Sequence, residues 1–399
     1  MEIKGEGKIK MKKILALILV VLMTVSLAAC ASAPDLPTSS GGASGGSSSG
    51  GSTAGSTEDD RFFVGVTFNG LDAVPALMKL YMEEMFDEKG WEYFTTNADL
   101  DASKQLSDVE NLLQKDPDVI LGRYVAAQRP SVLKLCDEAG VPAMAMSMGM
   151  RYSLTPEEDA LLLTGVGDSE WVRGIPLAYW LLDYMEANPD FVPKIGTVVG
   201  NASGDMIGQT HRTYDFMRTM QANGKEEGKD YHIVARTEAV PNWSTAGGMK
   251  VVEDWLSLYS IDELNTIYCW SDEMVVGVIQ ALQGAGKQPG EYIVMSFDGL
   301  EIVHEYVEQG WLQVSSAYDF KKQCTRIVEV LEMIKDGKID EIKPIEFAQS
   351  IFVLTPENIA AVKAGNIEYF EYTAEMELEP RLKGSDWYPE SAWASFMGE

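Results

Sequence analysis

Residues 62–96 read FFVGVTFNGLDAVPALMKLYMEEMFDEKGWEYFTT, and this stretch indicates a β-α-β unit. The apolar run over 62–68 predicts a short buried strand that ends in an Asn-Gly turn. Apolar residues at helical spacing then predict a helix over 75–89, closed by a glycine, and a second strand follows over 91–96. Strand, helix and strand in this order form the unit from which parallel sheets are built.

The same alternation continues toward the C-terminus. A first series of further elements is predicted as helix 101–115, strand 118–122, helix 132–139 and strand 141–146. After a polar connection around 155–159, a second series is predicted as helix 172–186, strand 195–199, helix 206–223, strand 231–238, helix 246–259, strand 266–270, helix 273–285 and strand 292–297. Continuous apolar strands between helices indicate parallel sheets covered on both faces. Two series therefore predict two α/β lobes, with ligand bound beyond the carboxyl ends of the strands and between the lobes.

The residues before this body have the three-part form of a secretory signal. A basic stretch that ends at Lys13 is followed by an apolar run over 14–25 and by small residues. The run is shorter than the roughly 20 residues that a membrane-spanning helix needs. Both Met1 and Met11 stay open as the start of translation.

The end of this signal carries a modification motif. Residues 27–30 read LAAC, which resembles the lipobox of bacterial lipoproteins. The resemblance implies that residues 1–29 are removed and that the thiol of Cys30 is acylated. The alternative is a plain secreted protein with a chance cysteine at its cleavage site. Residues 38–57 contain only Gly, Ser, Thr and Ala, so we expect 30–60 to be a flexible tether.

Charge and cysteine content exclude several classes of function. The chain has 399 residues with 61 acidic and 32 basic side chains, for a net charge of −29. Such acidity repels nucleic acids and anionic membranes, so neither is an expected partner through charge. The four cysteines include no CxxC pair, which argues against a disulfide scaffold and a structural zinc site.

Catalytic and cofactor motifs are missing from the sequence. It contains no P-loop, no HExxH pair and no GxSxG elbow, and the glycines of residues 165–167 do not complete a dinucleotide fingerprint. Asp272, Glu273 and Asp298 could be imagined as paired carboxylates for glycoside hydrolysis. Acidic residues at strand-to-helix boundaries are more typical of helix caps. We therefore expect no enzyme, no cofactor and no metal.

Three stretches resemble a known family. They are residues 101–112, DASKQLSDVENL; residues 138–142, EAGVP; and residues 271–299, which run from SDEM through ALQGAGK to SFDG. Together they resemble the type I periplasmic binding proteins, the ribose- and galactose-binding receptors of ABC importers. The resemblance covers residues 62–360, including a late strand over 345–353.

That family has two lobes joined by three crossings, which close on the ligand like a hinged clamp. The resemblance thus implies an α/β fold of two doubly wound parallel-sheet lobes. The expected divisions are a signal peptide (1–29), a tether (30–60), an N-terminal lobe (61–165 plus 319–344), a C-terminal lobe (166–318 plus 345–360) and an aromatic C-terminal extension (361–399).

Three positions match the sugar site of the family. Trp243 falls where the family places an aromatic ring that stacks on the sugar, and Arg212 matches a cleft arginine that donates to sugar oxygens. Asp298 ends its strand and is suited to accept from two hydroxyls. A sugar has an apolar C–H face, while each buried hydroxyl needs a partner. Plainer alternatives stay open: packing for Trp243, a surface ion pair with Asp215 for Arg212, and a helix cap for Asp298.

Other positions depart from the family pattern. Ser271 replaces an asparagine and loses its amide, and Met146-Ser147-Met148 stands where sugar binders carry an Asp-Arg pair. Residues expected to contribute in their place or in addition are Ser147, Arg123 at a strand end, Asn69 and Asp72 in the first loop, and Tyr318 in place of a hinge-side glutamine.

These features predict a lipid-anchored solute-binding protein on the outer face of the bacterial cell membrane. We expect it to be monomeric, to capture a small polar ligand, first of all a carbohydrate, and to deliver it to an ABC transporter permease. The alternative is a sensory receptor of the same fold that presents a signal molecule to a membrane kinase. A hydrolase of surface glycans is a remote third class, because its motifs are missing.

Overall fold

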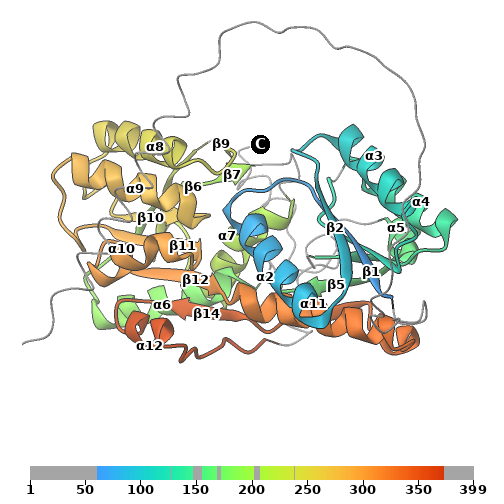
Figure 1. Ribbon diagram of the computed structural model, residues 1–399. Coiled ribbons are helices and arrows are strands. Elements are labelled where there is room, and N and C mark those ends of the chain that lie inside the picture. The colour runs from blue at the N-terminus through green and yellow to red at the C-terminus, as the bar shows by residue number, and fades with distance from the viewer. Residues whose placement is uncertain are drawn as a thin grey trace, which may run out of the picture. The chain divides into compact units, whose positions relative to one another are not determined.

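The computed structural model describes residues 61–125, 127–146, 155–168, 172–201, 207–237 and 239–372, with the backbone alone at 201 and 207–211. These residues form two six-stranded sheets flanked by helices and one two-stranded sheet (Figure 1). Cys30, the tether, Ser147 and the residues after 372 lie outside the described residues.

The first sheet is entirely parallel. Its strands, in spatial order, are β13 (Ile345–Phe347), β5 (Leu162–Gly167), β4 (Ala143–Ala145), β3 (Val119–Gly122), β1 (Phe63–Phe68) and β2 (Glu92–Asn97). Its helices are α2 (Ala73–Lys89), α3 (Ala102–Leu113), α4 (Arg129–Ala139), α5 (Pro156–Leu161) and α11 (Phe320–Lys335). Every residue of β1 is buried, as its unbroken apolar run predicts. Helices α2 and α11 pack against each other.

The second sheet is parallel except at one edge. Its strands, in spatial order, are β14 (Ile351–Leu354), β12 (Val314–Tyr318), β11 (Ile293–Asp298), β10 (Thr266–Cys269), β6 (Lys194–Val198) and β8 (His232–Arg236), of which β14 runs antiparallel to β12. Its helices are α6 (Gly174–Ala187), α7 (Ile207–Ala222), α8 (Thr245–Leu258), α9 (Asp272–Gly284), α10 (His304–Glu308) and α12 (Ile359–Lys363). The strands β7 (Gly200–Asn201) and β9 (Val240–Pro241) form the two-stranded sheet.

Helices α8 and α9 lie side by side (Figure 1) and touch through their backbones. A side-chain carbon at Gly248 would overlap the carbonyl of Met274, and one at Gly277 would overlap the carbonyl of Thr245. The Thr245 hydroxyl also donates to the Glu273 carbonyl at 2.8 Å. Glycine is therefore required at both positions, because no larger residue fits between the two backbones.

The predicted element order is confirmed with two corrections. The polar connection expected around residues 155–159 instead contains α5, with a capping box at its start, and leads directly into β5. The single late strand predicted over 345–353 is two strands. β13 pairs with β5 in the first sheet and β14 pairs with β12 in the second, so the assignment of residues 345–347 to the second lobe is wrong.

The chain passes between the two large sheets three times: from β5 to α6, from β12 to α11 and from β13 to β14. The predicted fold class, two doubly wound lobes with a three-crossing hinge, is thereby confirmed. Burial raises the pKa of Asp168, at the first crossing, although the hydroxyls of Ser350 and Tyr372 both donate to its carboxylate. At the second crossing, the Tyr369 hydroxyl donates to Asp319 at 2.6 Å, and the backbone N–H of Asp319 donates to Ser350.

We call residues 367–372 the strap, because they contact all three crossings. Ile367 and Tyr369 pack against the core of the second sheet, whereas Phe370 and Tyr372 pack against the core of the first. The amide of Gln349, at the third crossing, donates to the Tyr372 carbonyl at 2.9 Å. Aromatic side chains at the start of the C-terminal extension thus pack against the body of the protein.

Candidate functional site

Three candidate residues follow neighbouring strands at the carboxyl edge of the second sheet. Ser271 comes two residues after β10, Asp298 ends β11 and Tyr318 ends β12. These strands are adjacent and parallel, so the three residues are brought to the same edge. This is the edge at which open α/β sheets bind ligands.

Asp298 is held by two arginines. Its Oδ1 accepts a hydrogen bond from Arg173 Nη2 at 2.8 Å and lies 3.9 Å from Arg212 Nη1. Its backbone has a φ of 106°, a conformation that L-residues rarely adopt and that is often found at functional sites. The side chain of Asp298 is 10% exposed, so its charge depends on these neighbours for compensation.

A second buried carboxylate, Asp272, lies beside Asp298. It accepts hydrogen bonds from the Ser296 and Ser315 hydroxyls and from the backbone N–H of Leu300. Burial, with the nearby Asp298 charge, raises the pKa of Asp272 to about 8. Because Leu300 lies just beyond the turn that follows Asp298, Asp272 fixes the position of that turn. The sequence position of Asp272 favours a helix cap over a catalytic carboxylate, and only the fold shows that it shapes the site.

Arg212, on α7, is anchored at both its backbone and its side chain. Its guanidinium donates to the Trp270 carbonyl, and its own carbonyl accepts from the Tyr268 hydroxyl at 2.8 Å. It is buried, which contradicts the alternative of a surface ion pair with Asp215. The carboxylate of Asp215 is instead 3.2 Å from Arg218, on the same helix.

Trp243 is placed by an unusual backbone and is largely buried. Both Asn242 and Trp243 have φ of 53°, in the left-handed region. Its ring covers Gly200, where a side-chain carbon would overlap it, and the Arg212 guanidinium lies 5.8 Å from the ring centroid. The residue is 8% exposed, so packing accounts for most of its surface. Its role as a stacking ring stays a prediction.

Ser271 and Tyr318 also have structural partners. The Ser271 hydroxyl caps α9 by accepting from the backbone N–H of Met274 at 3.3 Å. The Tyr318 ring lies 3.9 Å from the Arg173 guanidinium and packs edge to face with Phe320. Ligand contacts by either residue stay predictions.

The candidate residues of the first sheet lie at its own carboxyl edge. Asn69 follows β1 and Arg123 follows β3, and these two strands pair directly. Asp72 stands at the N-cap of α2 without a capping hydrogen bond from its side chain. Partial desolvation raises the pKa of Asp72 even though its side chain keeps exposed surface; the Arg123 charge opposes this rise and the Asp298 charge adds to it.

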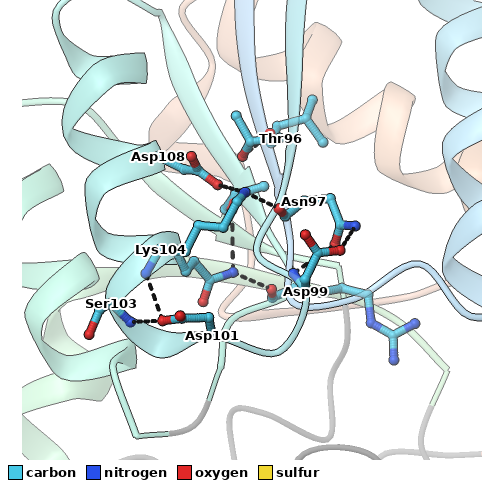
Figure 2. Close-up of polar contacts among 11 residues, drawn as sticks. Thr96, Asn97, Asp99, Asp101, Ser103, Lys104 and Asp108 are labelled. Atoms are coloured by element: carbon cyan, nitrogen blue, oxygen red, sulfur yellow. Dashed lines mark hydrogen bonds and ion pairs between the residues drawn. The ribbon is translucent and has the colours of Figure 1, made fainter. Parts of the chain in front are cut away.

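The loop after β2 is tied to the same edge by a polar network (Figure 2). Figure 2 shows Lys104 between the Asn97 carbonyl and the Asp108 carboxylate, and the Asn97 amide directed at Asp99. The backbone N–H of Leu100 donates to the Asn69 carbonyl at 2.6 Å. Asp99 and Leu100 both have positive φ. This network holds the loop against Asn69.

Glu273 lies at the edge of the site, although its sequence position favours a helix cap over a catalytic carboxylate. Burial raises its pKa to about 7, and the charges of Asp72 and Asp298 contribute to the rise, while the backbone N–H of Ala73 opposes it. Glu273 is therefore within electrostatic reach of carboxylates from both sheets. The other residue missed from the sequence, Arg173, has no local motif, because its contacts depend on how α6 packs.

The described residues include no group of three His, Cys, Asp or Glu side chains that could hold a metal ion. No helix within the described ranges combines the length and the apolar character that crossing a membrane would require.

Comparisons with curated proteins identify relatives of modest identity. The putative rhizopine-binding protein of Rhizobium meliloti is 24% identical over 272 residues, which is 67% of this chain and 80% of that protein. The galactofuranose-binding protein of Escherichia coli is 22% identical over 259 residues, 60% of this chain and 76% of that protein.

Solved structures show the same fold. An ABC transporter solute binding protein from Bacillus halodurans with bound myo-inositol is similar with a TM-score of 0.63 at 21% identity, over 77% of this chain and 99% of that one. A second, from Actinobacillus succinogenes with bound D-allose, has a TM-score of 0.62 at 20% identity, over 75% of this chain and 100% of that one. The model of the periplasmic binding protein domain family matches residues 63–339, well over half of the chain. The protein therefore belongs to the periplasmic binding protein domain family, which binds solutes and is not a family of enzymes.

Proposed function

We propose that the protein is a lipid-anchored extracellular solute-binding protein that captures a small carbohydrate or polyol between its two lobes. It then delivers this ligand to an ABC transporter permease. Contacts made by both lobes stabilise the closed state over the open one, and the permease responds to that difference.

The observation that carries this proposal is the position of Asp298. An acceptor carboxylate at the carboxyl edge of the second sheet, with Arg212 beside it and Tyr318 on the next strand, supplies the charged acceptors and donors that sugar hydroxyls need. Asp72 and Arg123 come from the first sheet. The pKa of Asp72 is raised in part by the Asp298 charge, which comes from the second sheet. Polar groups from both sheets thus face the same region.

The ligand class is supported by the relatives. Two relatives are named for binding rhizopine and galactofuranose, and two solved structures contain bound myo-inositol and D-allose. These molecules are ligands of those proteins. No feature of the described residues favours the sensory alternative. We therefore propose a sugar or an inositol-like polyol as the ligand of this chain.

The proposed anchor is the acylated Cys30. It rests on the lipobox-like sequence at residues 27–30 and on the Gly/Ser-rich tether that follows. Labelling with a radioactive fatty acid during expression in bacteria tests it. We expect label in the wild-type protein and none in Cys30→Ala, whereas equal labelling would contradict the anchor.

A thermal-shift screen of residues 58–399 tests the binding function. The panel comprises pentoses, hexoses in both ring forms, inositols and amino acids, the last as a negative set. A ligand at 100 times its Kd adds about 2.7 kcal/mol to the native state, which raises the melting temperature clearly. We expect a rise with one sugar or polyol class. A rise with amino acids alone would contradict the proposed ligand class.

A further inference from the structure

Arg173 is the most completely buried cation near the candidate site. It immediately precedes α6, after the crossing from β5, and its side chain has no exposed surface. Its Nη2 donates both to Asp298 Oδ1 at 2.8 Å and to the Ser316 carbonyl at 3.0 Å. Burial of a guanidinium without such partners would be strongly unfavourable, so this geometry is tightly specified.

Aromatic rings fix the plane of the same guanidinium. It lies 3.9 Å from the ring centroid of Tyr318 and 5.1 Å from that of Phe297. An arginine stacked on a ring and bonded to a carboxylate holds both groups in a defined relative position, which a lysine does not do. Arg173 thus connects two candidate ligand residues, Asp298 and Tyr318.

The residue after Arg173 explains how two arginines reach one carboxylate. A side-chain carbon at Gly174 would overlap the Arg212 carbonyl and lie 2.7 Å from the backbone nitrogen of Phe216. Glycine therefore allows α6 to touch the backbone of α7 at Arg212 itself. The pair Arg173-Gly174 brings both guanidinium groups to the end of β11.

The two oxygens of Asp298 have different surroundings. Both arginine contacts reach Oδ1. Within the described ranges, Oδ2 has no hydrogen bond or ion pair. Burial and the Asp298 charge favour the neutral form of the neighbouring Asp272 carboxyl, so the positive charge of Arg173 serves the carboxylate of Asp298.

We propose that Arg173 is a positioning residue for ligand binding, which fixes Oδ1 of Asp298 and the ring of Tyr318 so that Oδ2 accepts from ligand hydroxyls. Arg173 itself does not touch the ligand. This inference deepens the proposed function and rests on it, because it requires Asp298 to be a ligand contact.

A double-mutant cycle tests this role, with myo-inositol, D-ribose, D-allose and galactofuranose as probes and Kd measured by calorimetry. We expect Arg173→Met to weaken binding at least tenfold, because Asp298 loses its fixed orientation. In an Asp298→Asn background the same change is expected to alter Kd by less than twofold. Arg173→Lys, which keeps the charge but not the planar fork, is expected to give an intermediate loss.

Arg218→Met is the matched control, because it removes another arginine–aspartate pair on the same lobe, with Asp215. We expect it to lower the melting temperature without changing Kd. Equal and additive losses of affinity in the wild-type and Asp298→Asn backgrounds would overturn the positioning role while leaving the binding function intact. Failure of the wild-type protein to bind every probe would instead contradict the proposed function, and the positioning role with it.

The cycle is also run on urea unfolding of the free protein, which needs no ligand. We expect the Arg173→Met and Asp298→Asn changes to be strongly non-additive, because each leaves its partner buried without compensation. Additive changes would contradict the contact itself and so the inference. If Arg173→Met fails to fold, Arg173→Lys carries both measurements.

Discussion

Asp298 combines a strained backbone, a nearly buried carboxylate and two arginine neighbours. We expect Asp298→Asn to weaken sugar binding at least tenfold, because an amide keeps the size of the side chain but loses one acceptor and the charge. Calorimetry with the sugar found by the thermal screen measures this loss. Asp254→Asn, on the exposed face of α8, is the control and should bind like the wild type. An unchanged Kd in Asp298→Asn would remove Asp298 from the site.

Glu273 gives a pH-dependent prediction. Its folded-state pKa is raised to about 7 from an ordinary 4.5, first by burial and then by the Asp72 and Asp298 charges. A carboxyl with a raised pKa lowers stability as pH rises, since the folded state resists losing the proton. The free energy of unfolding should therefore fall between pH 5 and pH 8.

Glu273→Gln should reduce the slope with which the free energy of unfolding falls as pH rises. Urea unfolding at four pH values measures this slope. Glu253→Gln, exposed on α8, should leave the slope unchanged. A wild-type slope that Glu273→Gln does not alter would show that Glu273 is already ionised at pH 5. Asp272, whose pKa is raised to about 8, contributes in the same direction, as do Asp72 and Asp168, whose pKa values are also raised.

Among single residues, those at the ends of predicted strands were the easiest to place from sequence. Asp298 follows an apolar run, so its position at a sheet edge needed only the strand pattern, whereas Tyr318, after the less apolar β12, was selected through the family resemblance. The burial of Trp243 was not predictable, because it depends on Gly200, more than forty residues away. Arg173 was missed for the same reason, because its partners lie more than a hundred residues away, on β11 and β12.

At the scale of elements, the glycine contact between α8 and α9 makes a sharp prediction. Gly277→Ala should destabilise the protein by about 2 kcal/mol or more, because the new carbon overlaps the Thr245 carbonyl and forces the helices apart. Gly284→Ala is the matched control on the same helix, since its side-chain carbon would meet nothing within 4 Å.

We expect Gly284→Ala to be neutral or to stabilise by up to about 1 kcal/mol, as alanine lowers the entropy of the unfolded chain. Urea denaturation of both variants measures the difference. Equal free energies of unfolding in the two variants would mean that α8 and α9 can move apart without loss of stability. Because Ser271 and Trp243 precede these helices, Gly277→Ala should also weaken ligand binding.

The helices and strands with strong apolar periodicity were predicted to within three residues. Two strands departed from the prediction for the same physical reason. They are buried because they pair with other strands, and their own sequences carry no local pattern that shows it. β5 contains Gly165 and Gly167 and gave no clear strand signal, yet it lies between β4 and β13. The late strand divides because residues 348–350 cross from one sheet to the other.

On the scale of the whole molecule, the strap predicts a pH-dependent contribution to stability. Burial raises the pKa of Asp168, and the Tyr372 hydroxyl is one of the donors that oppose this rise. Tyr372→Phe removes that donor. The ionised carboxylate of Asp168 then loses more stabilisation than the neutral acid does. We expect a loss of about 1 to 3 kcal/mol at pH 8 and a smaller loss at pH 5.

Tyr179→Phe, at an exposed position on α6, is the control for the loss of a phenol hydroxyl. Thermal and urea unfolding at both pH values provide the measurement. A loss that is larger at pH 5 than at pH 8 would contradict the assigned role of Asp168.

The strap also determines where the chain can be cut without disturbing the crossings. Its residues Tyr369 and Tyr372 hydrogen bond with Asp168, Asp319 and Gln349, one residue at each crossing. Proteolytic cleavage on the C-terminal side of Tyr372 leaves these bonds in place. A cut before Ile367 detaches the strap from the rest of the chain, and loss of the strap removes its hydrogen bonds at all three crossings and uncovers apolar surface on both cores.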